Sequence, residues 1–141
     1  MVPGTTPVLY TSCTRDGALA ELTYHWSKQD PPPSKPAILS KIAVRTRNTL
    51  RLTKPLLIDL GVDWSSFSED ASGITARIGS AIGHLEFDGF MAPSARWPGE
   101  NLMLLLTNHD FDEQSLRVTN TETIEWMAWR DSHVSRDSPK E

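Results

Sequence analysis

The sequence predicts a single α+β domain in which short strands outnumber helices. Two segments, residues 15–28 and 73–85, carry the 3.6-residue apolar period of helices, and they lie early and in the middle of the chain. Six or seven short segments of aliphatic and β-branched residues, bounded by turn residues, are typical of strands. Helices and strands do not alternate as a doubly wound parallel sheet requires, so we expect an α+β architecture.

The size and charge of the chain limit the classes of protein to which it can belong. With 141 residues, 38% of them hydrophobic, it can bury a core without disulfides. Its net charge of −4 gives no electrostatic reason to bind DNA or an anionic membrane, so we expect no direct nucleic-acid binding and no membrane association. The single cysteine, Cys13, cannot form an internal disulfide or a cysteine-based zinc site. No apolar run reaches the ~18 residues of a membrane span and no signal pattern is present, so we expect a cytoplasmic protein.

The stretch from Pro7 to Trp26 is central to the functional interpretation. Residues 8–12 predict a short buried strand, and Thr14 is a suitable N-cap for a helix over residues 15–28. Glu21 lies opposite the apolar face of that helix. This face comprises Leu19, Leu22 and Trp26. A strand, turn and helix in this order can bind a phosphate at the helix N-terminus and place a carboxylate nearby.

Residues 37–53 predict two strands that carry a basic run. We expect a strand over 37–46, a turn at Arg47-Asn48 and a short partner strand over 49–53. The first strand would place Ile38, Ile42 and Val44 on one face and Lys41 and Arg45 on the other. The basic run comprises Lys41, Arg45, Arg47, Arg51 and Lys54. We interpret it chiefly as a solvated strand face, with a surface for phosphate or an acidic partner as the alternative.

The middle of the chain predicts one long helix. Residues 54–62 fit either a strand end or one helical turn, and residues 63–70 fit a loop or flap that holds Trp64 and Phe67. Ser72 is a suitable N-cap for a helix over 73–85. The apolar face of that helix comprises Ile74, Ile78, Ile82 and Leu85.

The last third of the chain predicts strands and a polar tail. The expected elements are a turn at Asp88-Gly89, a strand over 90–92, a loop over 93–100, a strand over 101–107, and two closing strands over 115–120 and 123–129. The nearly continuous apolar run of 101–107 predicts a central strand that is buried on both faces. We expect residues 1–130 to form the domain and residues 131–141 to form a polar, frayed tail.

Taken one at a time, the chemical candidates favour structural interpretations. The chain contains no glycine-rich phosphate loop, HExxH, CxxC or nucleophile elbow. The segment NHDFDE, residues 108–113, has neither zinc nor EF-hand spacing, so it predicts a solvated turn and no metal site. Glu21 with His25 fits a surface pair four residues apart, and Ser94 fits a loop serine that bonds its own backbone.

Taken together, three stretches resemble the RES domain family, which is named for an arginine, a glutamate and a serine. They are PVLYTSCTRDGALAELTYH (7–25), the helix with GFMAPSARWPG (73–99), and ENLMLLL (100–106). Each motif is short, but the three occur in the family's order and spacing. The resemblance covers most of residues 4–120.

This resemblance implies a fold, an activity and partners. The fold would be similar to that of ADP-ribosyltransferases, with two small mixed or antiparallel sheets and about two main helices. Proteins of this family are toxins of bacterial toxin–antitoxin pairs, and each is neutralised by a helix-turn-helix antitoxin of the Xre type. They consume NAD by hydrolysis or phosphorolysis, or they transfer ADP-ribose to a protein. The alternative is an inactive or truncated module that only binds its antitoxin.

The resemblance also assigns site residues. Glu21, Tyr10 and Ser94 match the family's catalytic positions. Glu21 would stabilise the oxocarbenium-like ribose, Tyr10 would stack on the nicotinamide riboside, and Ser94 would close the pocket from the opposite loop. The residues expected to bind NAD are Tyr10, Thr11, Ser12, Arg96 and Asn101. No metal is expected.

The family's arginine belongs to a segment upstream of the region that begins at Pro7. Met1 stands only a few residues before Pro7, so the sequence predicts that this segment is missing. Arg15 follows Tyr10 in the chain and cannot replace it in order. Pyrophosphate binding would then depend on other cations.

Overall fold

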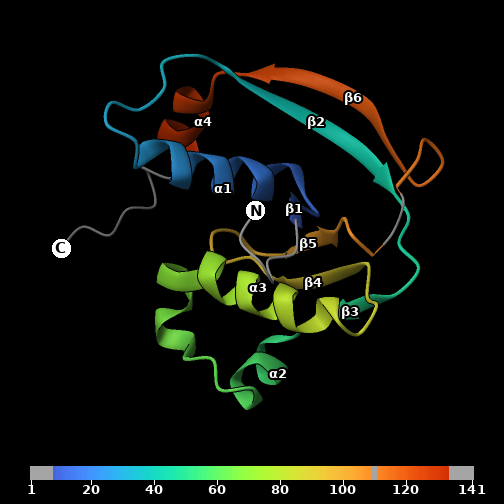
Figure 1. The fold of residues 1–141 in the computed structure, drawn as a ribbon. Coiled ribbons are helices and arrows are strands. Elements are labelled where there is room, and N and C mark those ends of the chain that lie inside the picture. The colour runs from blue at the N-terminus through green and yellow to red at the C-terminus, as the bar shows by residue number, and fades with distance from the viewer. Residues whose placement is uncertain (1–7, 109–110, 134–141) are drawn as a thin grey trace.

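A computed structural model describes residues 8–108 and 111–133 of the chain (Figure 1). The strands are β1 Val8–Ser12, β2 Ala37–Val44, β3 Thr49–Arg51, β4 Gly89–Pro93, β5 Glu100–Leu105 and β6 Leu116–Ile124. The helices are α1 Arg15–Ser27, α2 Lys54–Asp59, α3 Phe67–Gly83 and α4 Trp126–His133, with a 3₁₀ turn, η1, over Trp64–Ser66. The α+β class and the two long helices are confirmed. Among the described residues, no helix is long and apolar enough to cross a membrane.

The larger sheet has four strands in the order β1-β5-β4-β3. β5 pairs antiparallel with both β1 and β4, as expected for the central strand, whereas β3 and β4 are parallel. α3 covers this sheet (Figure 1), and its Ile74 and Ile82 join Phe90 and Met103 in one buried cluster. This apolar interface holds the sheet and α3 together as a rigid base.

The smaller sheet is a two-stranded antiparallel ribbon of β2 and β6, which arches over α1 (Figure 1). A second buried cluster lies beneath it, where Leu19 of α1 packs with Ile124, Trp126 and Trp129. The Thr14 hydroxyl accepts a hydrogen bond from the Gly17 N–H at 3.0 Å and caps α1 as expected. α1 therefore lies between the ribbon and the larger sheet.

Two expectations about strand environment are wrong. β1 is an edge strand and not a buried one, because only β5 pairs with it. β3 pairs with β4 and not with β2. The physical reason is the buried carboxylate of Asp88, which accepts hydrogen bonds from the Arg47 and Asn48 N–H groups at 2.7 and 2.8 Å. These bonds direct the chain after β2 away from the ribbon and into the larger sheet.

The helix of the middle segment begins earlier than its sequence predicts. The Asp63 side chain accepts hydrogen bonds from the Ser65 N–H and hydroxyl and caps the 3₁₀ turn, which leads directly into α3 at Phe67. The segment expected to be a loop or flap is therefore largely helical. α3 ends at Gly83, so Leu85 lies beyond it and is 65% exposed, contrary to the expected apolar face.

The last third of the chain differs most from the expectation. β6 is one continuous strand without a turn at Asn120-Thr121, and the second predicted strand, residues 123–129, is largely the helix α4. Trp126 and Trp129 are three residues apart, so a helix places both against α1, whereas a strand would separate them. The expected polar tail overlaps α4 at residues 131–133, and its remainder lies outside the described residues.

Candidate active site

A cleft with a volume of about 1210 Å³ lies where α1, the edge strand β1 and the β2–β6 ribbon meet. α1 contributes a stripe of residues that recur every three to four positions: Arg15, Ala18, Leu22 and His25. Tyr10 and Asn101 line the cleft from the larger sheet, and Leu39 and Glu122 line it from the ribbon. The volume exceeds that of most sites for drug-sized ligands, so the cleft has room for a dinucleotide.

Glu21 is the carboxylate at the sheet side of this cleft. Its side chain is 27% exposed. One carboxylate oxygen, Oε2, accepts hydrogen bonds from the Ser94 hydroxyl at 3.0 Å and from the Asn101 amide at 2.9 Å. The other oxygen, Oε1, lies 3.9 Å from His25 Nε2. Glu21 is therefore held by one oxygen while the other remains open to a ligand.

Further hydrogen bonds fix the two groups that hold Glu21. The Ser12 hydroxyl donates to Asn101 Oδ1 at 3.0 Å, which leaves the Asn101 NH₂ group to face Glu21. The Arg96 N–H donates to the Ser94 hydroxyl oxygen at 3.1 Å, so the hydroxyl proton is directed toward the carboxylate. Preorganised polar groups of this kind keep a carboxylate in place without reorganisation during a reaction.

The strand pairing explains why these residues meet. Ser12 lies opposite Asn101 in the β1–β5 register, and Ala92 lies opposite Asn101 in the β4–β5 register. The loop after β4 therefore starts at the same end of the sheet, and it is closed by a hydrogen bond from the Ser94 N–H to the Gly99 carbonyl. α1 leaves β1 at this end too. Three distant segments thus place Glu21, Ser94 and Asn101 together.

Comparison with known proteins agrees with this arrangement. The family model for the RES domain matches residues 1–129. The chain belongs to the RES domain family. The described fold is similar to a chain in the crystal structure of the M. tuberculosis MbcT–MbcA toxin–antitoxin complex, with a TM-score of 0.70 and 16% sequence identity over 89% of this chain and 70% of that chain. No curated protein matches the sequence. The expected family and its α+β fold are confirmed.

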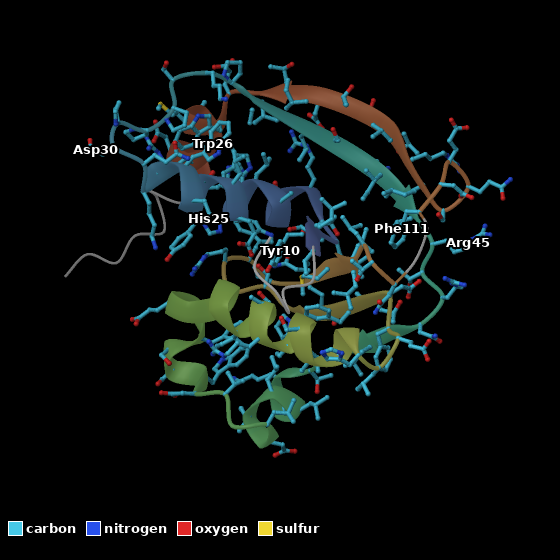
Figure 2. All side chains as sticks on the ribbon, viewed as in Figure 1. Tyr10, His25, Trp26, Asp30, Arg45 and Phe111 are labelled. Atoms are coloured by element: carbon cyan, nitrogen blue, oxygen red, sulfur yellow. The ribbon has the colours of Figure 1, made fainter. Side chains whose placement is uncertain are left out.

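The three residues of β1 that were expected to bind a ligand, Tyr10, Thr11 and Ser12, all lie along the cleft of this RES domain. Tyr10, on the edge strand of the larger sheet, is 52% exposed and lies beside α1 (Figure 2). Thr11 also lines the cleft, but its hydroxyl donates to the Leu102 carbonyl at 2.7 Å. Tyr10 is therefore the large aromatic surface that β1 offers to a ligand, and the Thr11 hydroxyl is already engaged with the sheet.

Ser94 and Arg96 are placed differently from their expected positions around the pocket. Neither is among the residues that line the cleft. Ser94 supports Glu21 from behind, and the Arg96 guanidinium lies over the Tyr24 ring, with its Cζ 3.3 Å from the ring centroid. Arg96 also donates to the Ser68 carbonyl. In this structure Arg96 joins α1 to α3 and does not face the cleft.

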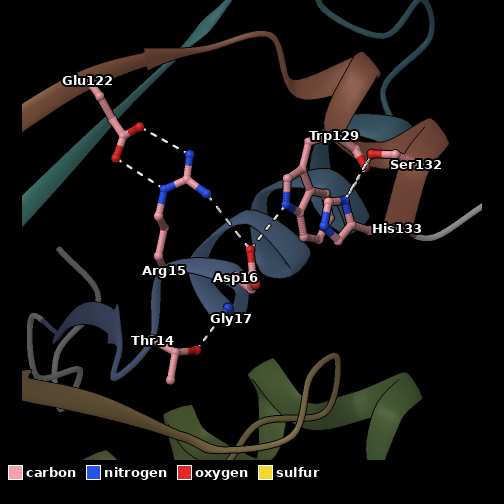
Figure 3. Close-up of polar contacts among 8 residues, drawn as sticks. All are labelled: Thr14, Arg15, Asp16, Gly17, Glu122, Trp129, Ser132 and His133. Carbon is pink, nitrogen blue, oxygen red and sulfur yellow. Dashed lines mark hydrogen bonds and ion pairs between the residues drawn. The ribbon is translucent and has the colours of Figure 1, made fainter.

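The ribbon wall of the cleft was not predicted from the sequence. Arg15 makes two hydrogen bonds to the Glu122 carboxylate, at 3.0 and 3.1 Å, and these connect α1 to β6 (Figure 3). The Arg15 bond holds the pKa of Glu122 below its usual value. The basic run does not form one surface, since Arg51 pairs with Glu100 while Lys41 lines the cleft. Only the three-dimensional pairing of β2 and β6 could reveal this wall.

Cys13 also lines the cleft, but its thiol is not activated. Burial, followed by the negative charge of Glu100, raises the pKa of the Cys13 thiol, so the thiol is protonated at neutral pH and is a poor nucleophile. The described residues contain no group of three or more metal-ligating side chains. The Glu21 cluster is the candidate catalytic group of this cleft.

Proposed function

We propose that this protein is the toxin of a bacterial toxin–antitoxin pair and that it consumes NAD by cleaving the nicotinamide–ribose bond. The observation that carries the proposal is the Glu21 carboxylate, which is fixed through Oε2 and open through Oε1 beside a cleft large enough for a dinucleotide. Membership of the RES domain family supports the same activity.

The chemistry requires a fixed negative charge beside the ribose. As the bond from ribose C1′ to the nicotinamide nitrogen breaks, both electrons leave with neutral nicotinamide and positive charge develops on the sugar. Glu21 Oε1 would stabilise this charge or accept a hydrogen bond from a ribose hydroxyl. Water or phosphate then attacks C1′ and loses a proton, which yields ADP-ribose or its phosphorylated form. Attack by a protein side chain would instead give ADP-ribosylation.

The neighbouring residues have supporting roles in this proposal. Tyr10 would stack on the flat nicotinamide or on the ribose face. Ser94 and Asn101 position Glu21, while Ser12 positions Asn101. His25 lies 3.9 Å from Glu21 Oε1 and also lines the cleft. Thr11 would form part of the wall of the pocket. Its hydroxyl is not available to the substrate, because it donates a hydrogen bond to the Leu102 carbonyl.

The proposed partner is a cognate helix-turn-helix antitoxin of the Xre type. The support is family membership and the similarity to a chain from a toxin–antitoxin complex. A protein acceptor of ADP-ribose is a further possible partner if the reaction is a transfer. The net charge of −4 favours neither DNA nor an anionic membrane as a direct partner, and we place the activity in the cytoplasm.

The proposal is tested by the loss of NAD. Purified protein is incubated with NAD, with and without phosphate, and the products are separated by chromatography. We expect free nicotinamide from the wild type and a loss of at least about a hundredfold in rate for Glu21→Gln, because the amide keeps the shape but removes the charge. Glu113→Gln is the matched control, since Glu113 is exposed and lies outside the cleft.

The outcomes separate an enzyme from a binding module. If the wild type and Glu21→Gln leave NAD equally intact, the enzymatic proposal is wrong. Co-purification with an antitoxin would then favour the module that only binds its partner. A phosphorylated ADP-ribose that forms only with phosphate would identify phosphorolysis. ADP-ribose attached to a protein would identify ADP-ribosyl transfer.

A further inference from the structure

A second group of charged side chains lies in the cleft, on the ribbon wall and away from the Glu21 cluster. It comprises Arg15 of α1, Lys41 of β2 and Glu122 of β6. In the ribbon register Leu39 lies opposite Glu122 and Lys41 lies opposite Asn120, and all four side chains line the cleft. The ribbon wall therefore presents the Lys41 ammonium group next to the Asn120 amide.

Lys41 shares the face of Leu39 by the ordinary alternation of β2, and a β-bulge follows it. The β2–β6 register shifts between Lys41 and Ile42, and this shift accounts for Ile42 lining the cleft beside Lys41. The same shift explains why Ile38, expected on the face of Ile42, is 66% exposed. Bulges commonly re-aim a side chain next to a functional site. In a regular strand Lys41 and Ile42 would point to opposite faces.

The charge balance of the wall distinguishes Lys41 from Arg15. The Arg15 guanidinium is bound by Glu122 through two hydrogen bonds and lies 3.9 Å from Asp16, so its charge is largely balanced (Figure 3). Within the described residues, no carboxylate lies within ion-pair distance of Lys41. Lys41 is therefore the cation of this wall that is available to an anion.

The distance along α1 between Arg15 and Glu21 suits a nucleotide whose ribose lies at Glu21 and whose phosphate lies at the ribbon wall. Arg15 precedes Glu21 by six residues, which is about 9 Å along a helix axis. The Arg15–Glu122 bonds fix the ribbon at this level, and Lys41 lies two residues beyond Leu39, the register partner of Glu122. A ribose bound at Glu21 would thus direct its 5′-phosphate toward the ribbon wall.

We propose that Lys41 binds the pyrophosphate of the dinucleotide, with Asn120 beside it, and that the Arg15–Glu122 pair positions Lys41 by holding the ribbon against α1. This rests on the proposed function, because it assigns a role within the NAD cleft. Arg96 was expected to bind NAD, but its guanidinium lies over Tyr24 and not in the cleft. Lys41 would supply the cation for the phosphates in its place. The reacting atoms lie at Glu21, so Lys41 affects binding and not bond cleavage.

The test compares two ligands that differ in the pyrophosphate. Binding of NAD and of nicotinamide riboside is measured by titration calorimetry in the Glu21→Gln background, which prevents turnover. We expect Lys41→Gln to weaken NAD binding about tenfold, as the loss of one charge-assisted contact predicts, and to leave nicotinamide riboside binding unchanged. Arg45→Gln is the matched control, since Arg45 follows the same strand and Figure 2 shows it at the far end of the ribbon, away from α1.

Three results would overturn this inference. They are unchanged NAD affinity in Lys41→Gln, an equal loss for both ligands, and no NAD binding by the Lys41-containing protein. Thermal unfolding and circular dichroism of Lys41→Gln check that the ribbon is intact. Because binding is measured without turnover, a protein that binds NAD through Lys41 yet never cleaves it would contradict the proposed function alone.

Discussion

Glu21 has two oxygen atoms in different situations. Oε2 receives hydrogen bonds from a hydroxyl and an amide, whereas among the described residues the polar group recorded near Oε1 is the His25 ring, at 3.9 Å. A carboxylate held in this way loses little orientational freedom when a substrate binds. The Ser94 and Asn101 contacts therefore act on catalysis through Glu21 and not through the substrate.

Ser94→Ala and Asn101→Ala should each lower kcat by about tenfold to a hundredfold, since each removes a hydrogen bond to a charged group. KM should change little, because neither bond is made to the substrate. Steady-state assays of NAD loss measure both constants, and Ser34→Ala, an exposed loop serine, is the control. A rise in KM at unchanged kcat would show that these residues contact the substrate instead.

At the scale of elements, the sequence predicts those segments whose local signals agree with their packing. β1, α1, β4 and β5 have clear boundaries because Thr14 caps α1 and apolar runs end at turn residues. The segment over residues 123–129 predicts a strand because its threonine, isoleucine and tryptophans are residue types that favour strands, whereas the structure has the helix α4 there. The contact of Trp126 and Trp129 with α1 decides in favour of the helix.

The junction of α1 and β6 gives a pH dependence to stability. The hydrogen bond from Arg15 lowers the pKa of Glu122 in the folded protein. A lowered carboxyl pKa stabilises the fold above the unfolded-state value of about 4.5, and this stabilisation is lost as the pH falls through the folded-state value. The melting temperature of the wild type should therefore decline more steeply than that of Glu122→Gln below about pH 5.

Asp63 and Asp112 also have lowered pKa values, but they are present in both proteins and cancel in the comparison. Arg15→Gln should reproduce the shallower decline, and the double variant should add nothing further. Parallel melting curves for the wild type and Glu122→Gln across this range would exclude a stabilising role for the pair.

At the scale of the whole molecule, α4 connects the ribbon, α1 and the loop that carries Ser94. Trp129 donates its indole N–H to Asp16 of α1 at 3.2 Å and stacks on His133 (Figure 3). Its ring also contacts Trp97, which belongs to the same loop as Ser94. The C-terminal helix thus supports the residues that hold Glu21, although it lies outside the cleft.

Trp129→Ala should lower the free energy of unfolding by about 3–5 kcal/mol, as for other large aromatic side chains removed from a core. Trp129→Phe retains the apolar ring but loses the bond to Asp16, so a cost nearer to ~1 kcal/mol is expected. Urea unfolding followed by circular dichroism measures both. Equal costs for the two variants would mean that the indole hydrogen bond, and not the buried ring, stabilises α4.

The Glu21 cluster was found by resemblance and not by spacing. Ser94 and Asn101 are 73 and 80 residues from Glu21, and no local pattern connects segments so far apart. The role of Lys41 depends on the pairing of β2 with β6 along the cleft, which alternation in the sequence does not reveal. Local sequence patterns thus predict the helices and strands. The site depends on how distant strands pair, and the sequence pattern does not show this.

The order of synthesis has a consequence for a protein of this kind. Glu21 precedes β6 in the chain, and β6 completes the ribbon that forms one wall of the cleft. A nascent chain that has not reached Leu116 has no ribbon partner for β2, and therefore no enclosed place for a dinucleotide. If the proposed activity is correct, a chain that already contains Glu21 stays inactive until β6 has been made and has paired with β2.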